Sequence, residues 1–313
     1  MLEAAAQTVR QVLRCEGRHR ILLISLQSSV FSLQFPVIRA ESNMHPVLFD
    51  IGSFPLGTYG LLLAIAFFAG TALAKRQAKL DGLNPAAITD LAIAMLIAAI
   101  VGSKLLMILV GLFTPAGQEG AMTLREVFTL STLRAGGAIH GGIIAATATF
   151  FWKLRKGQGL PLRLTGDALV PGVALGQAIG RLGCFSAGCC YGTETHLPWA
   201  ATFTNPLAQA FSGTPLGIPL HPVQLYNTLA NLTVMAILLV VRGKRQFHGQ
   251  IFALYFLVEG LGRVITETWR GDVDRGMGWL GWAWLSTGRL TGIAFMMLGL
   301  GLWLFWNRHQ EAK

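Results

Sequence analysis

The chain has 313 residues, of which 53% are hydrophobic and only 13% are charged, and its formal net charge is +10 at pH 7. This composition is typical of a protein that folds in a lipid bilayer and argues against a water-soluble domain. Its Lys and Arg residues lie in short clusters between apolar runs, not on a long polar domain with interleaved aromatic residues. We therefore expect no nucleic-acid partner.

The N-terminal segment 1–43 differs from the rest of the chain, because a basic stretch precedes the moderately apolar residues 21–38. Three interpretations are open: a signal-like or additional membrane segment with its basic end inside, a disordered tail, or an extension upstream of a true start at Met44. Met44-His45-Pro46 opens the first well-formed module, which favours the third. We expect an atypical extension, 1–43, followed by one membrane domain, 44–313.

Seven apolar stretches follow, and several reach the roughly 18 to 25 residues that a helix needs to cross about 30 Å of hydrocarbon. This pattern predicts an all-α, polytopic integral membrane protein with about seven transmembrane helices. The predicted spans are 57–74, 87–113, 137–152, 167–187, 223–241, 249–269 and 288–306.

Every second connection between these spans is basic, which predicts orientation through the positive-inside rule. The C-terminus and the basic connections are expected in the cytoplasm, and the start of the first span outside. The segment 191–222 has no Lys or Arg and is expected to form a small periplasmic loop or cap. The cytoplasmic basic residues are Lys75, Arg76, Lys79, Lys153, Arg155, Lys156, Arg163, Arg242, Lys244, Arg245, Arg308 and Lys313.

Several ionisable residues lie within or beside the spans, where each costs about 2.5 to 3.5 kcal/mol at mid-bilayer. With this orientation, four of them fall in the outer half of the membrane together with Tyr59. Snorkelling explains one or two such cations, but it explains a one-sided cluster poorly. The excess positive charge favours an anionic ligand such as a phospholipid head group. The ionisable residues are Lys104, His140, Arg181, Arg263, Glu267 and Arg270.

Two of these positions keep a purely structural alternative. Arg263 and Glu267 are four residues apart, so they can form an intrahelical ion pair with no further role. His140 lies among glycines, including Gly141 and Gly142, that allow close helix packing. It is either a hydrogen-bonded packing residue or a group that exchanges a proton near neutral pH.

Three cysteines, Cys184, Cys189 and Cys190, lie in the glycine-rich segment 180–192 that closes the fourth span. They are interpreted first as small buried apolar side chains, and second as a redox pair or a nucleophile. A disulfide between the adjacent pair would be strained. Because the CxxC pairs of a zinc site are absent from the sequence, neither a metal site nor a cofactor is expected.

Taken together, these residues resemble the bacterial prolipoprotein diacylglyceryl transferase family over about residues 44–306. Each motif alone is weak, whereas their order and spacing make chance similarity improbable. The motifs are Tyr59-Gly60, Gly102-Ser103-Lys104 where the family usually has Gly-Gly-Arg, Gly136-Gly137, His140-Gly141-Gly142, Asp167, Gly180-Arg181-Leu182-Gly183, His221-Pro222-Val223-Gln224-Leu225-Tyr226, and the segment from Arg263 through Glu267 to Arg270.

The resemblance implies an enzyme of the bacterial inner membrane whose active site faces the periplasmic leaflet. It implies transfer of the diacylglyceryl group of phosphatidylglycerol to the lipobox cysteine of a prolipoprotein signal peptide. Arg181 and Arg263 would hold the phosphate, Glu267 would orient Arg263, and His140 or Tyr59 would remove the thiol proton. Lys104, Gly141, Gly142, Gly183 and Gly192 would adjoin the lipid, and the secondary candidates are Cys184, Cys189, Arg270, His221, Gln224 and Tyr226.

One segment departs from the family pattern. Where the family continues with Asn-Phe-x-Asn-x-Glu, this chain has Cys184, Ala187 and Cys189 in place of the two Asn and the Glu. Two alternatives therefore stay open. One is a related phospholipid-dependent transferase with another acceptor, using Cys189 as a covalent relay. The other is a non-enzymatic protein that binds or transports lipid.

Overall fold

The computed structural model describes residues 40–42, 47–51, 54–115, 121–127, 129, 132, 137–156, 159–272, 276–278, 282 and 284–308. The predicted extension 1–43 therefore lies outside the described residues, except for the short strand β1 (Ala40–Ser42). Gly136 of the glycine motif also lies outside them.

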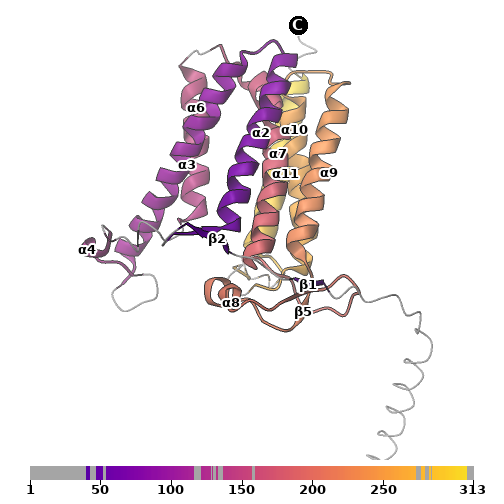
Figure 1. Cartoon of the computed structure of the whole chain (residues 1–313). Coiled ribbons are helices and arrows are strands. Elements are labelled where there is room, and N and C mark those ends of the chain that lie inside the picture. The colour runs from indigo at the N-terminus through magenta and orange to yellow at the C-terminus, as the bar shows by residue number, and fades with distance from the viewer. Residues whose placement is uncertain are drawn as a thin grey trace, which may run out of the picture.

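Long helices occur at the predicted apolar spans and run alongside one another (Figure 1). Five of them are long and apolar enough to cross a membrane: α2, α3, α7, α9 and α11. Two further helices, α6 and α10, have 17 residues each. The protein is mostly helical and multi-pass. The bounds are α2 Thr58–Leu80, α3 Pro85–Phe113, α6 Ile139–Arg155, α7 Leu162–Ala187, α9 Val223–Arg242, α10 Gln250–Thr266 and α11 Thr287–Arg308.

Large apolar side chains project from the outer surfaces of these helices. Phe68 is 71% exposed, Phe113 is 84% exposed and Val240 is 71% exposed when no lipid surrounds the protein. A water-soluble protein does not normally expose contiguous apolar surface on this scale. Because helices satisfy their own backbone hydrogen bonds, these surfaces are suited to contact acyl chains.

Glycines set the close packing of two helix pairs. A Cβ added at Gly70 of α2 would lie 2.6 Å from the carbonyl oxygen of Gly172 in α7. A Cβ added at Gly102 of α3 would lie 2.6 Å from the carbonyl oxygen of Gly141 in α6. The helix backbones touch at both crossings, as small residues permit in membranes. The α2–α7 pair and the α3–α6 pair are thus two tightly packed units of the bundle, and α2 also contacts α3.

Short strands and turns gather at one end of the bundle, opposite the end at which α11 stops (Figure 1). The hairpin β2 (Val47–Ile51) and β3 (Phe54–Gly57) leads directly into α2. The predicted loop 191–222 contains β4 (Ala201–Phe203), α8 (Pro206–Ser212) and β5 (Pro219–Leu220). β1 pairs in parallel with β4, which pairs antiparallel with β5. These strands were not predicted, and we call the segment 191–222 the cap. Two further short helices are α4 (Leu124–Val127) and η1 (Glu267–Trp269).

Asp167, which the sequence analysis placed in a motif, has a structural role. Its side chain is fully buried near the start of α7, and it accepts hydrogen bonds of 2.8 Å from the backbone N–H groups of both Gly249 and Phe252. These groups lie at the N-terminus of α10, where backbone donors lack partners within the helix. Asp167 therefore docks the start of α10 on α7, with Arg245 3.8 Å away.

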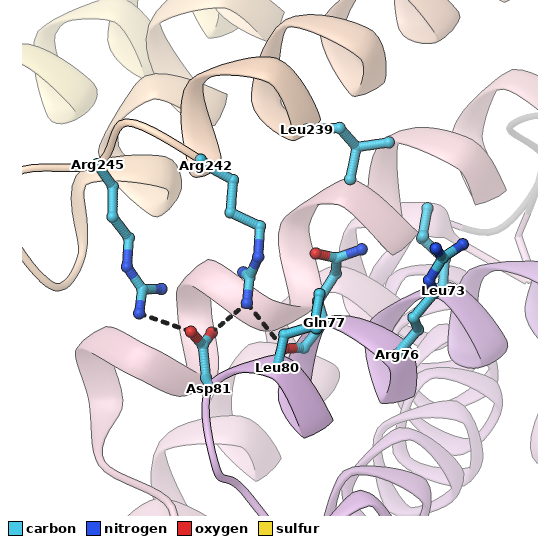
Figure 2. Close-up of a pocket in the computed structure, with 9 residues that line it drawn as sticks. Leu73, Arg76, Gln77, Leu80, Asp81, Leu239, Arg242 and Arg245 are labelled. Carbon is cyan, nitrogen blue, oxygen red and sulfur yellow. Dashed lines mark hydrogen bonds and ion pairs between the residues drawn. The ribbon is translucent and has the colours of Figure 1, made fainter.

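A second buried carboxylate joins the ends of α2 and α9 (Figure 2). Asp81, whose side chain is 3% exposed, lies 2.7 Å from Arg242 Nη2 and 2.6 Å from Arg245 Nη2. Arg242 also donates to the carbonyl oxygen of Gln77 at 2.8 Å. Arginine suits this position because its planar fork can serve several acceptors at once. The cluster lines a cavity of about 530 Å³ at the end of the bundle away from the cap.

Replacing Asp81 with Asn is expected to destabilise the protein by about 3 kcal/mol, because both arginines lose the carboxylate that compensates their burial. Thermal unfolding in detergent micelles measures this as a lowered Tm. Asp90→Asn, at an exposed position of α3, is the matched control. An Asp81→Asn variant that unfolds with the control would contradict a stabilising role for the cluster.

Candidate active site

The cap-side ends of α2, α7 and α10 bring several of the predicted residues together. Gly183 of α7 packs on α2, since an added Cβ there would lie 3.1 Å from Tyr59 Cδ2. Arg181, two residues earlier, is half-buried and interacts electrostatically with Tyr59 and with Arg263 of α10. Glu259, one turn before Arg263, also interacts with both arginines. Three helices thus supply one charged site.

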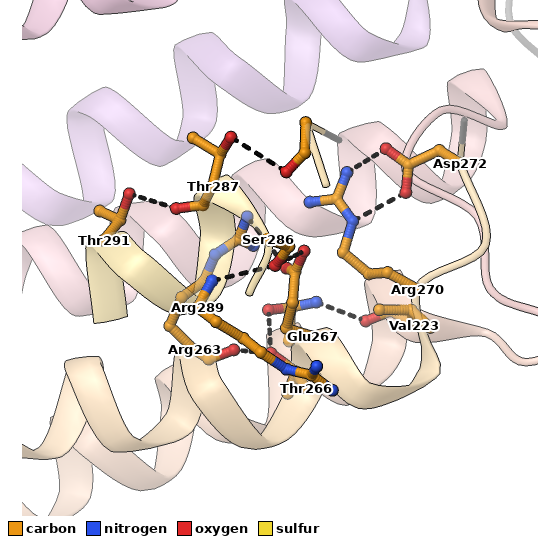
Figure 3. A network of polar contacts seen from close by, with 12 residues as sticks. Val223, Arg263, Thr266, Glu267, Arg270, Asp272, Ser286, Thr287, Arg289 and Thr291 are labelled. Atoms are coloured by element: carbon orange, nitrogen blue, oxygen red, sulfur yellow. Dashed lines mark hydrogen bonds and ion pairs between the residues drawn. The ribbon is translucent and has the colours of Figure 1, made fainter. Parts of the chain in front are cut away.

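Arg263 and Glu267 form the ion pair expected from their four-residue spacing (Figure 3). Arg263 Nη2 lies 3.4 Å from Glu267 Oε2, and the Glu267 side chain is only 1% exposed. Ser286, just before α11, donates a 2.9 Å hydrogen bond to Glu267 Oε1. The carboxylate is therefore held from two directions and can fix the orientation of the guanidinium.

Arg263 keeps donor capacity beyond this pair. Its Nη1 atom is buried and has no hydrogen-bond partner among the described residues. A guanidinium carries five N–H donors and no acceptor, so a buried nitrogen without a partner is costly unless a ligand satisfies it. An anionic oxygen is the partner that best matches both its charge and its geometry.

Arg270 is held differently from Arg263. It is 8% exposed, and its Nε donates a 2.8 Å hydrogen bond to Asp272 Oδ1 while Nη2 pairs with Asp272 Oδ2. This bidentate pair raises the pKa of Arg270 despite its burial. The backbone around Arg270 also pairs with Gly192 of the cap. Arg270 therefore anchors the connection after α10 to the cap.

Gly192 is buried within the cap. A Cβ added there would lie 2.6 Å from the His221 Cβ and 2.8 Å from a methyl group of Val223. The space next to Gly192 is thus occupied by other residues of the chain. Its predicted contact with lipid stays a prediction.

Aromatic and polar side chains fasten the cap to the start of α9. His221 Nδ1 lies 3.2 Å from the Tyr226 hydroxyl, which also accepts a 2.8 Å hydrogen bond from Trp199 Nε1. Burial lowers the pKa of His221, so the ring is neutral at pH 7. Gln224, fully buried, donates from Nε2 to the Cys189 carbonyl oxygen at 2.8 Å. Gln224 therefore positions the segment that carries the cysteines, and the His221 and Tyr226 contacts hold the cap on α9.

The three cysteines converge, which their spacing in the sequence did not reveal. Cys184 lies in the last turn of α7, and Gly188 ends the helix with a φ of 78°. The turn brings Cys189 and Cys190 back, so that the three Sγ atoms all lie within 4.8 Å of one another. Hydrogen bonds with the other two thiols, and then the Arg270 and Arg181 cations, lower the pKa of Cys190.

Lys104 and His140 lie on the α3–α6 pair. Lys104 Nζ donates a 3.0 Å hydrogen bond to the Thr132 carbonyl oxygen, and His140 is exposed in the first turn of α6. Gly141 and Gly142 are buried where α6 packs on α3. Helix α2 contacts both α3 and α7, and it lies between them in Figure 1. The joint action of His140 with Arg181 stays a prediction.

Sequence reasoning missed several residues of the site. It did not single out Glu259, although its place one turn before Arg263 was a usable signal. Nothing local in the sequence indicated that Ser286 reaches Glu267, because that contact joins α10 to the start of α11. Asp272 was a usable signal, since it lies two residues after Arg270.

Comparison with known proteins identifies the family of this chain. A family model described as prolipoprotein diacylglyceryl transferase matches residues 46–305. The chain is 34% identical over 258 residues to a phosphatidylglycerol–prolipoprotein diacylglyceryl transferase of Clostridium tetani, covering 82% of this chain and 96% of that protein. It is 33% identical over 281 residues to the protein of the same name from Gloeobacter violaceus, covering 89% and 98%. This chain therefore belongs to the prolipoprotein diacylglyceryl transferase family.

Proposed function

We propose that this chain transfers the diacylglyceryl group of phosphatidylglycerol to the lipobox cysteine of a prolipoprotein signal peptide, the first step of lipoprotein maturation. The observation that carries the proposal is the buried, unpartnered Nη1 of Arg263, in a site that it shares with Arg181. The family membership and the names of the relatives support the same reaction.

The chemistry requires a thiolate and a stabilised leaving group. The acceptor sulfur attacks the carbon of the diacylglyceryl group that is bonded to a phosphate oxygen. A C–S bond forms, and the bond between that carbon and the phosphate oxygen breaks. Its electron pair leaves with glycerol phosphate, whose charge Arg181 and Arg263 stabilise. The thiol proton passes to His140, or less readily to Tyr59. The attraction between each arginine and the phosphate charge is stronger here than in bulk water, because the effective dielectric constant inside a protein is lower.

We further propose that all seven long helices cross the bacterial inner membrane. At 17 residues, α6 and α10 extend about 25 Å, which covers most of the hydrocarbon core. The basic residues Arg242 and Arg245 lie at the bundle end away from the cap, which supports a periplasmic cap and a cytoplasmic C-terminus. The lipid would then enter from the periplasmic leaflet.

The two groups of residues suggest how substrates are arranged. Arg181 and Arg263 would hold the phosphate on the α7–α10 side of α2. Lys104 and His140 would approach from the α3–α6 side, and Gly141 and Gly142 would keep those helices close. Tyr59, 44% exposed on α2, lies on the helix between the two groups. A lipid seated at this end of α2 could contact both.

Arg181→Ala and Arg263→Ala are each expected to lower transfer at least about 100-fold, the loss typical of removing one charge-stabilising donor. The assay is the mass shift of a lipobox peptide in vesicles containing phosphatidylglycerol. Arg155→Ala, at an exposed position at the far end of α6, is the matched control. A wild-type rate in either site variant would refute its assigned role.

His140→Ala is expected to abolish complementation in a strain lacking its own diacylglyceryl transferase, whereas Tyr59→Phe should retain growth. The reason is that a base must accept the thiol proton, and a phenol is a weak base near neutral pH. Western blots must show equal membrane levels of both variants. Growth with His140→Ala and failure with Tyr59→Phe would exchange the two roles.

Gly288→Ala should lower transfer about 100-fold by displacing Glu267, because an added Cβ would lie 2.5 Å from the carboxyl carbon of Glu267. Gly301→Ala in the same helix, where nothing lies within 4 Å of an added Cβ, is the matched control. The vesicle assay compares the two. Equal activity of both variants would show that orientation of Arg263 by Glu267 is unimportant.

A further inference from the structure

Cys184 and Cys189, which replace an Asn and the Glu of the family pattern, form a cluster with Cys190. Cys184, Cys189 and Cys190 are all half-buried, and their Sγ atoms lie within 4.8 Å of one another. Cys189 also approaches the Cys184 carbonyl oxygen at 3.7 Å. Nothing in the proposed transfer reaction requires three thiols at one point.

The separation of the sulfur atoms fits a shared metal ion. At a Zn–S distance of about 2.3 Å, two ligands of a tetrahedral ion lie about 3.8 Å apart, and those of a trigonal ion about 4.0 Å apart. Side-chain adjustments of a few tenths of an ångström to about 1 Å therefore bring the cluster to bonding geometry. Thiolates prefer soft or borderline ions such as Zn²⁺ and Cu⁺.

Two cations adjoin the cluster. Arg181 and Arg270 both interact electrostatically with Cys190. Three thiolates without cations would repel one another, whereas these arginines and a bound ion compensate them.

We propose that Cys184, Cys189 and Cys190 bind one thiophilic metal ion through three thiolates and leave a fourth coordination position open. Among the described residues, the cluster contains no fourth His, Cys, Asp or Glu ligand. Three protein ligands with an open position are the arrangement of catalytic zinc sites, whereas structural sites are closed. The cluster adjoins the candidate active site, because Cys190 interacts electrostatically with Arg181.

The open position would also be able to bind the acceptor thiol, a step that rests on the proposed function. A thiol that coordinates zinc is deprotonated. An acceptor cysteine bound there would lose its proton to water and become a thiolate beside the phosphate site. Metal binding itself does not depend on this use and is tested separately.

The direct test is titration of the full chain, in detergent micelles and with its thiols reduced by a phosphine, with Co²⁺ and then Zn²⁺. We expect one ion per chain, a thiolate-to-cobalt charge-transfer absorbance, and displacement of Co²⁺ by Zn²⁺. Cys184→Ser and Cys189→Ser should each weaken binding at least tenfold. Cys15→Ser is the matched control and should leave binding unchanged. Failure of the wild-type protein to bind, or equal binding by the site variants, would overturn the proposal.

A second measurement needs no variant and so does not depend on folding of the serine mutants. Zn²⁺ should slow alkylation of the three clustered cysteines, read by peptide mass spectrometry, relative to the same protein treated with a chelator. A peptide with a lipobox cysteine should shift the Co²⁺ spectrum, and its serine analogue should not. Unprotected clustered cysteines, or a disulfide among them in the freshly purified protein, would contradict the metal site. An unchanged spectrum with the cysteine peptide would contradict the open position.

Discussion

The site depends on positive charge held where water is scarce. Arg181 and Arg263 interact at the cap-side end of the bundle, and Glu259 interacts with both of them. Glu267 is held within the protein, because Ser286 donates to one of its oxygens and Arg263 lies near the other. A buried guanidinium nitrogen without a partner is costly, and an anionic lipid head group is the partner that we propose for Arg263.

Charged groups are buried at both ends of the bundle. At the far end, Asp81 and Asp167 are nearly or fully buried and accept from arginines or from a helix N-terminus. These interactions join α2, α7, α9 and α10, and Arg242 Nη1 and Arg245 Nη1 are buried there without a hydrogen-bond partner among the described residues. Arg263 Nη1 at the cap end shares this feature. Arg263 differs from the far-end arginines in that it lies in one site with Arg181.

Hydropathy predicted the positions of the long helices well, because a run of about 20 apolar residues is a long and unambiguous signal. The strands β1 to β5 were not predicted, since each has five residues or fewer and little periodicity. Within the site, the Arg263–Glu267 pair followed from spacing along one helix. The Ser286 contact could not be predicted from spacing, because it depends on tertiary packing. The convergence of the cysteines could not be predicted either, because it depends on the left-handed turn at Gly188. The expectation of no metal site was based on the absence of CxxC pairs from the sequence. The turn at Gly188 brings cysteines together at other spacings, and the expectation stays untested.

The central claim is that the arginine pair binds the phosphate of an anionic lipid before any chemistry occurs. Native mass spectrometry of the full chain in lipid–detergent mixtures measures this directly, by comparing retention of phosphatidylglycerol with retention of the uncharged diacylglycerol. We expect the wild-type protein to retain phosphatidylglycerol in preference to diacylglycerol. In an Arg181→Gln/Arg263→Gln double variant, we expect retention of phosphatidylglycerol to be strongly reduced. Equal retention of both lipids by the wild-type protein, or unchanged retention of phosphatidylglycerol by the double variant, would contradict it.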